Sequence, residues 1–264
     1  MNKHILSGKL ALVTGASSGL GVDFARGLAE FGCNLVLVAR RENRLQKVKE
    51  SLINDYGVEV TVIPMDLVQR EAPQRLYDQL TEMDKTVDVL INNAGFGLHG
   101  EFVDIPWEKE GNMLDLDIVT LTHLTKLFVK DMVAQNFGFI MQVSSIGAYQ
   151  PSPTYATYSA AKSYVLYFGE ALNYELRNVN VSCTVVSPGI TATEFLQVSG
   201  QKPTLYQRIM MMKSADVTQI GLKAMLKRRS SVVPGWLNAF IAFLTRFMPR
   251  RVSAMLGYKL MTMQ

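Results

Sequence analysis

The sequence predicts an α/β fold, a doubly wound parallel sheet of the Rossmann type in a single domain. Two observations predict it. Short, continuous apolar runs alternate along the chain with segments of helical periodicity, and such runs are typical of strands buried on both faces of a parallel sheet. The first run, residues 9–13, leads directly into the glycine-rich residues 14–21, which predict a strand, a tight turn and a helix.

The other elements follow in order along the 264 residues. Apolar residues recur between 113 and 132 with a period close to about 3.6, and a second long helix is predicted over 157–177. The sequence contains no repeat, low-complexity segment or flexible linker. We therefore expect one domain over 1–264, with a core at about 7–235. The remaining apolar runs, each predicted to be a strand, are 34–39, 58–63, 87–92, 139–144, 181–187 and 231–234.

The composition is that of a globular protein, with 48% hydrophobic and 19% charged residues. Cys33 and Cys183 stand apart in apolar, strand-like contexts, so we expect reduced core thiols. His4, His99 and His123 are scattered, and no metal site is predicted. The short apolar run near the start does not resemble a secretory signal. We expect a cytoplasmic protein.

Positive charge is concentrated near the C-terminus. Residues 217–264 contain eight lysines and arginines and no acidic residue, a charge of +8, whereas residues 1–216 carry −4. Such asymmetry indicates an anionic partner or a membrane surface. We predict no nucleic-acid partner.

The glycine-rich residues 14–21 can hold a pyrophosphate, because glycine lets backbone N–H groups approach phosphate oxygens at a helix N-terminus. Ligands of such a sheet bind beyond the carboxyl ends of its strands. Arg40 and Arg41 are the first two residues after the second strand, and a cation in place of an acid there favours the 2′-phosphate of NADP(H). We assign this role to Arg40, whereas Arg41 either shares it or begins a solvated helix. Asp66, after the third strand, is a candidate acceptor for the adenine amino group.

Two further motifs follow the next two strands. Residues 92–95, Asn-Asn-Ala-Gly, leave room for a flat ring or a ribose, although a structural turn uses the same residue types. Tyr158 and Lys162 lie four residues apart and share one helix face. An ammonium beside a phenol lowers its pKa from about 10, and the hydroxyl of Ser145 can hydrogen-bond a substrate oxygen. Tyr155 and Ser144 are weaker rivals; Tyr155 has no lysine four positions later.

The order and spacing of these motifs resemble those of the short-chain dehydrogenase/reductase family, of the compact type. The motifs that carry the resemblance are the glycine loop, residues 92–95, Ser145, Tyr158-x-x-x-Lys162 and Pro188-Gly189. The resemblance covers about residues 7–235. Residues 93–97 and 188–195 are similar to the DltE-like group of bacterial reductases.

The resemblance implies an NADP(H)-dependent oxidoreductase that transfers a hydride between the nicotinamide and a carbonyl or secondary alcohol. It implies that Tyr158 is the general acid/base, that Lys162 holds the nicotinamide ribose and lowers the pKa of Tyr158, and that Ser145 positions the substrate. A homodimer or homotetramer is also implied, formed through the helices at 113–132 and 157–177. The implied cofactor contacts are Tyr158, Lys162, Gly15, Ser17, Ser18, Gly19, Leu20, Gly21, Asp66, Leu67, Asn93, Ala94, Gly95, Pro188, Gly189, Thr191 and Thr193.

Asp117 departs from the family pattern, which has an asparagine there that holds a water of the proton relay. An aspartate keeps the acceptor oxygens but loses the amide donor. Buried near Lys162, it can pair with the ammonium and weaken the effect of Lys162 on Tyr158. The aspartate at position 117 is the one feature of the sequence that favours the alternative function, a non-catalytic dinucleotide-binding sensor.

The substrate side is less specific. Residues 190–215 are expected to form a substrate loop, and its apolar residues 209–212 suit either a lipophilic carbonyl compound or ordinary packing. A basic helical tail is expected over 236–264. Its apolar stretch is too short and interrupted to span a bilayer. It can lie on a membrane surface, cap the pocket or form an oligomer interface. Its apolar residues on one predicted helix face are Trp236, Phe240, Phe243, Leu244 and Phe247.

Overall fold

A computed structural model of the chain describes residues 3–201 and 210–262. Within them, seven strands form one parallel sheet in the order β3-β2-β1-β4-β5-β6-β7. This order reverses beside β1, as in a doubly wound fold. The strands are β1 Leu10–Thr14, β2 Asn34–Ala39, β3 Val60–Pro64, β4 Val89–Asn92, β5 Gly138–Val143, β6 Val181–Val186 and β7 Ser231–Val232.

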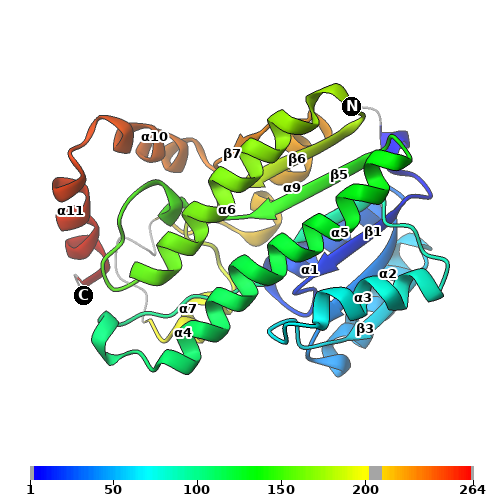
Figure 1. Cartoon of the computed structure of the whole chain (residues 1–264), viewed down its shortest axis with the longest axis horizontal. Helices are drawn as coiled ribbons and strands as arrows, with labels where there is room; N and C mark the ends of the chain where they lie inside the picture. Colours follow the sequence, from blue (N-terminus) through cyan, green and yellow to red (C-terminus); the bar gives the residue numbers. More distant parts are fainter. Residues whose placement is uncertain (1–2, 202–209, 263–264) are drawn as a thin grey trace.

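Helices cover both faces of the sheet (Figure 1). One apolar cluster joins α1, α2 and α9 to the strands, and a second joins α3 and α5 to the opposite face. The predicted α/β class is confirmed, and every strand lies within two residues of its predicted ends. The helices are α1 Gly19–Glu30, α2 Glu42–Tyr56, α3 Ala72–Glu82, α4 Trp107–Leu114, α5 Leu121–Ala134, α6 Ala156–Glu175, α7 Phe195–Ser199, α9 Ser214–Leu226, α10 Trp236–Leu244 and α11 Arg250–Thr262.

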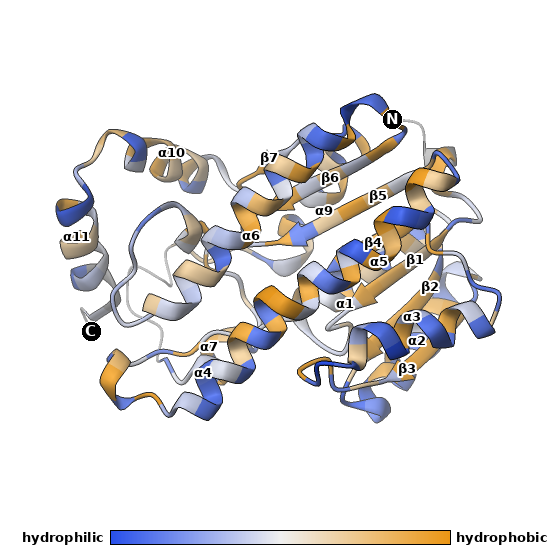
Figure 2. Cartoon of the chain, in the orientation of Figure 1, coloured by the Kyte–Doolittle hydropathy of each residue, from blue (hydrophilic) through white to orange (hydrophobic). Residues whose placement is uncertain are grey.

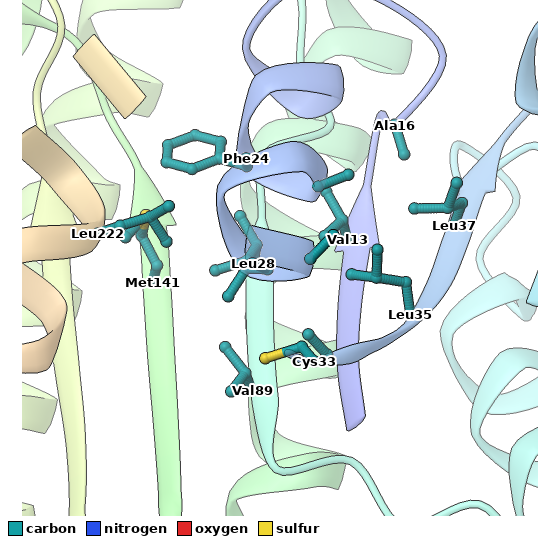
Figure 3. Packing of buried hydrophobic residues seen from close by; sticks show 14 of the residues in the cluster. Val13, Ala16, Phe24, Leu28, Cys33, Leu35, Leu37, Val89, Met141 and Leu222 are labelled. Atoms are coloured by element: carbon teal, nitrogen blue, oxygen red, sulfur yellow. The ribbon is translucent and has the colours of Figure 1, made fainter. Parts of the chain in front are cut away.

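The core consists of branched and aromatic side chains between α1 and the strands. Figure 3 shows Phe24 and Leu28 of α1 packed among Val13, Leu35 and Leu222, all fully or almost fully buried. The hydropathy colouring shows the same separation, with apolar strands inside and the polar residues of α2 and α3 outside (Figure 2). This layering holds the strand ends, and therefore the loops beyond them, in a fixed arrangement.

The two cysteines are core residues, as the sequence predicts. Cys33 and Cys183 are both buried and free. Burial raises the pKa of each thiol to about 12, because the thiolate is poorly solvated inside the protein.

The long helix predicted over 113–132 is interrupted. A π-helical segment, Asp115–Thr120, separates α4 from α5. The wider turn rotates the buried face, so that Asp117 and Thr120 are buried whereas Ile118 is only half-buried. Such π-turns frequently lie at functional sites, and here one directs the Asp117 carboxylate inward.

The C-terminal tail forms α10 and α11, at the end of the molecule toward which the strands point (Figure 1). Within the described ranges, no helix is both long and apolar enough to cross a bilayer. Part of the predicted substrate loop, residues 202–209 with Ile209, lies outside the described residues. Beyond it, Thr191 forms a parallel bridge with Met212.

Candidate active site

A cleft of about 670 Å³ lies beyond the carboxyl ends of the strands. Gly21 and Asp117 are the two sequence-predicted site residues that do not line it. Gly21 lies behind the loop, where a Cβ would come 2.8 Å from the side chain of Asn93, and Asp117 is buried behind Lys162. The predicted residues that line it are Gly15, Ser17, Ser18, Gly19, Leu20, Arg40, Asp66, Leu67, Asn93, Ala94, Gly95, Ser145, Tyr158, Lys162, Pro188, Gly189, Thr191 and Thr193.

The glycine loop is tied to the neighbouring strand β4. Gly15 adopts φ 68°, and a Cβ there would lie 3.0 Å from Ala94 Cα, so this position needs glycine. The Thr14 hydroxyl accepts the backbone N–H groups of Asn93 and Ala94, each at 3.0 Å. In return, Asn93 Nδ2 donates to the Thr14 carbonyl at 2.9 Å. The loop is therefore held in shape by the protein itself.

Arg41 lies over this loop, at the end of β2. Its Nη2 donates to Ser18 Oγ at 2.8 Å and to Ser17 Oγ at 3.2 Å. Its Nη1 forms an ion pair with Glu194 at 3.0 Å, and Arg44 pairs with the same carboxylate. These arginines lower the pKa of Glu194 below its ordinary value. Arg40, the residue favoured from the sequence, lines the cleft but makes no side-chain hydrogen bond or ion pair with the described residues.

The adenine side of the cleft lies at the end of β3. Asp66 Oδ1 accepts the backbone N–H of Val68 at 3.2 Å, which leaves the second carboxylate oxygen for a ligand. The carbonyl of Leu67 accepts the Thr120 hydroxyl at 2.7 Å. The π-helical segment thus anchors this loop.

Ser145, Tyr158 and Lys162 meet at the centre of the cleft. Ser145 follows β5, and its hydroxyl hydrogen-bonds the Tyr158 side chain. Tyr158 and Lys162 lie on one face of α6, with Lys162 Nζ 5.7 Å from the centre of the Tyr158 ring. Lys162 Nζ also donates to the Val143 carbonyl at 3.2 Å. The three groups occupy the arrangement expected of an acid, its positioning cation and a hydrogen-bond donor.

Asp117 pairs with Lys162, with Oδ2 3.1 Å from Nζ. Both side chains are buried, and the predicted pairing is confirmed. Burial raises the pKa of Asp117, although the Lys162 ammonium and the backbone N–H of Phe96 oppose this. Gly95 leaves room for the pair, because a Cβ there would lie 3.1 Å from Lys162 Nζ.

The pKa of Tyr158 differs from the sequence-based expectation. It is raised above its ordinary value, first by burial and then by the negative charge of Asp117, while the hydrogen bond with Ser145 lowers it by less. Burial is the larger cause, because a phenolate is poorly solvated inside the protein, and the negative charge of Asp117 acts in the same direction.

The loop after β6, residues 188–193, forms another wall of the cleft. Ile146 N donates to the Pro188 carbonyl at 2.8 Å, and the Thr193 hydroxyl accepts the N–H of Phe195 at 3.2 Å. The Phe195 ring then packs on Tyr158, with their centres 5.5 Å apart. Pro188 to Thr193 are therefore held beside the central tyrosine.

The rival residues have other partners. The Ser144 hydroxyl donates to the Lys162 carbonyl at 2.7 Å and so stabilises α6. The Tyr155 hydroxyl donates to Gln201 Oε1 at 2.8 Å, and burial raises its pKa to about 12. Tyr155 supports the wall of the cleft, away from the lysine.

Sequence reasoning missed Thr14 and Glu194. Thr14 is the last residue of β1, and its place before the first loop glycine is a usable signal. Glu194 is separated from Arg41 by 153 positions, so only the folded chain brings the two together.

Comparison with known proteins agrees with this geometry. The profile described as short chain dehydrogenase matches residues 9–204. The strand order, with a cleft beyond the carboxyl ends of the strands, defines a doubly wound fold of the Rossmann class. The chain belongs to the short-chain dehydrogenase/reductase family.

Three curated relatives are 30–32% identical to the chain over the aligned residues. A Drosophila melanogaster dehydrogenase/reductase SDR family protein 7-like is 32% identical over 73% of this chain and 60% of its own length. An Anas platyrhynchos very-long-chain 3-oxoacyl-CoA reductase is 31% identical over 75% and 65%. A Mediterraneibacter gnavus 7beta-hydroxysteroid dehydrogenase is 30% identical over 72% and 71%. The chain thus spans about 60% of the first relatives it matches.

Solved structures match the fold over most of the chain. A structure of 7beta-hydroxysteroid dehydrogenase has a TM-score of 0.87 at 24% identity, over 97% of this chain and 99% of that one. A Sphingobium yanoikuyae short-chain dehydrogenase in complex with NADPH has a TM-score of 0.81 at 28% identity, over 92% and 97%. A Burkholderia phymatum relative in complex with NAD has 0.80 at 25%, over 90% and 93%.

Proposed function

We propose that the protein is an NADP(H)-dependent carbonyl reductase or alcohol dehydrogenase acting on lipophilic ketones, aldehydes or secondary alcohols. The single observation that carries the proposal is the meeting of Ser145, Tyr158 and Lys162 in the same cleft as the glycine loop and Arg41. A protein that only sensed the dinucleotide would not need this proton-transferring group.

The cleft fits a dinucleotide phosphate. The loop is preshaped by Thr14 and Asn93 at the N-terminus of α1, where backbone N–H groups favour anions. Arg41, held by Ser17 and Ser18, supplies a planar cation suited to a 2′-phosphate, with Arg40 beside it. The residue directly after β2 is Arg40, where a carboxylate would instead favour a free 2′-hydroxyl.

When bound, the nicotinamide supplies or accepts the hydride. In reduction, the Tyr158 hydroxyl donates its proton to the substrate oxygen as negative charge develops there. The Ser145 hydroxyl hydrogen-bonds the same oxygen and aligns the carbonyl. Lys162, fixed by Val143 and Asp117, faces the Tyr158 ring and stabilises the phenolate left after proton transfer. Oxidation reverses these steps, with the Tyr158 phenolate as the base.

The substrate half of the cleft is apolar, which favours a lipophilic compound. Two relatives are named 7beta-hydroxysteroid dehydrogenase and very-long-chain 3-oxoacyl-CoA reductase, and these names support a lipophilic substrate class here. The apolar side chains that line this half are Phe96, Leu98, Phe195, Leu196, Val198 and Ile241.

The test is NADPH oxidation with a panel containing a ketosteroid, a 3-oxoacyl thioester and a polar ketose. We expect turnover with the apolar ketones, and a loss of about 100-fold or more in Tyr158→Phe. Tyr174→Phe is the matched control, because Tyr174 is an exposed tyrosine on the same helix. Equal turnover by Tyr158→Phe contradicts the mechanism. Tight NADPH binding with no turnover of any carbonyl supports the sensor instead.

Self-association as a homodimer or homotetramer is proposed from membership of the family. The contact surface would be the exposed sides of α5 and α6, where Tyr167 and Val133 are solvent-accessible. Sedimentation of the full chain tests this, with Tyr167→Glu expected to lower the mass.

A further inference from the structure

Helix α10 carries its apolar face outward. Trp236, Phe240, Phe243 and Phe247 recur at helical spacing across α10 and the turn after it, and are 81%, 52%, 51% and 72% exposed. We call these four residues the aromatic stripe. The opposite side buries Asn238 and the small residue Ala242. A surface helix normally does the reverse, so the stripe is suited to contact with another apolar phase.

The inner side of the tail contacts the rest of the protein and lines the cleft. Asn238 Nδ2 donates to the Pro234 carbonyl at 3.1 Å, and Ala242 and Thr245 line the cleft. On α11, the Ser253 hydroxyl donates to Gln150 Oε1 at 3.2 Å. These contacts hold the tail on the enzyme, and none of them involves the aromatic stripe.

Four cations follow the stripe along the tail, one in the turn after α10 and three on α11. Arg246, Arg250, Arg251 and Lys259 are all exposed, and none forms an ion pair with any part of the chain that the structure describes. The sequence from 217 to 264 contains no acidic residue to neutralise them. An exposed apolar patch with unpaired positive charges is complementary to a surface that is apolar beneath and negative on top.

We propose that the aromatic stripe and these four cations bind the surface of an anionic lipid bilayer. Aromatic rings settle at the level of the lipid headgroups, and each nearby lysine or arginine strengthens attraction to anionic lipids. A second copy of this chain is a poorer occupant. A twofold interface would bring both copies of these cations into one contact surface, where the tail offers no acidic residue to neutralise them, and such like-charge crowding is costly.

Docking in this way places one wall of the cleft beside the bilayer, because α10 lines the cleft through its inner side. An apolar substrate dissolved in the membrane would then enter without crossing water. The binding itself does not depend on the proposed reductase activity, so the two proposals fail separately.

The experiment is flotation of the full chain with vesicles of phosphatidylcholine alone, or of phosphatidylcholine mixed with phosphatidylglycerol. We expect binding to the mixed vesicles, weakened by high salt. Arg246→Gln/Arg250→Gln/Arg251→Gln should bind about 100-fold more weakly. Lys223→Gln/Lys227→Gln/Arg229→Gln removes three exposed cations of the same basic segment away from the stripe and should bind as the wild type does.

The stripe is tested by Trp236→Ser/Phe240→Ser/Phe247→Ser, which should abolish flotation. Trp107→Ser, at an exposed tryptophan on α4, is the control that should leave it intact. Circular dichroism checks that each variant is folded, and a misfolded stripe variant is replaced by Trp236→Ser alone. The proposal is overturned if the wild type does not bind mixed vesicles, or if the stripe variant still does. A concentration-dependent dimer that the stripe substitutions dissociate, without vesicle binding, would identify a second copy instead.

Discussion

Two ion pairs of nearly equal length stand at opposite sides of the cleft and differ in burial. Lys162 and Asp117 are 3.1 Å apart and 6% and 0% exposed. Arg41 and Glu194 are 3.0 Å apart and 41% and 39% exposed. Judged by distance alone, the two ion pairs would be expected to contribute equally to stability. Burial separates them, because the dielectric environment and not the contact distance decides what an ion pair contributes.

This difference in burial suits the different role of each ion pair in the site. Breaking a buried pair leaves an uncompensated charge without water, so Lys162 and Asp117 stay together and hold the lysine against Tyr158. An exposed pair is screened by solvent and is readily exchanged. Glu194 can therefore release Arg41 to a phosphate.

The largest expected effect comes from breaking the buried pair on one side. Lys162→Met should lower the free energy of unfolding by about 3–5 kcal/mol, because it leaves Asp117 buried and unpaired. The double variant Lys162→Met/Asp117→Leu should recover most of this loss. Urea unfolding followed by circular dichroism measures both. Equal stabilities of the single and double variants would mean that the pair is not coupled.

The next effect is a shift in pH dependence. The charge of Asp117 raises the pKa of Tyr158, so Asp117→Asn should lower that pKa. The rate of alcohol oxidation rises as Tyr158 deprotonates, and its rising limb should therefore move to lower pH in the variant. The falling limb of carbonyl reduction should move the same way. Superimposable pH–rate profiles of the wild type and Asp117→Asn would remove Asp117 from the proton chemistry.

In the exposed ion pair, we expect substitution of Arg41 to change the affinity for the cofactor and not the stability of the fold. Arg41→Gln should raise the Kd for NADPH about tenfold, the effect of losing a charge-assisted hydrogen bond, and leave the Kd for NADH unchanged. Arg75→Gln, an exposed arginine on α3, is the control. Fluorescence titration measures the Kd for each cofactor in the wild type and in both variants. An equal loss for both cofactors would show that Arg41 does not contact the 2′-phosphate.

The smallest effect is expected at Glu194, and its sign is the informative part. Glu194→Gln removes the carboxylate that competes for Arg41, so the Kd for NADPH should fall by up to about fivefold. The thermal unfolding midpoint should not change. Glu50→Gln, at an exposed acid further along α2, should leave both values as in the wild type. Weaker NADPH binding by Glu194→Gln would instead assign Glu194 to holding the loop closed over the cofactor.

Sequence reasoning performed differently in the two regions for a physical reason. Strand ends were predictable because buried parallel strands are continuous apolar runs, and Ser145, Tyr158 and Lys162 follow such ends at readable spacings. The π-turn around Asp117 was not, because a single extra residue per turn leaves little trace in hydrophobic periodicity. The lowered pKa expected for Tyr158 rested on the neighbouring Lys162 and did not include burial of the phenol, which raises the pKa together with the charge of Asp117.

By itself, the sequence determined the doubly wound fold, the glycine loop and the identity of the central tyrosine, lysine and serine, since these depend on local pattern and spacing. Only the folded chain shows that Arg41 meets Glu194 across 153 positions, that a π-helical segment carries Asp117, and that α10 turns its aromatic residues outward. These outcomes depend on burial and on which distant segments meet, and burial sets the strength of every charge in the site.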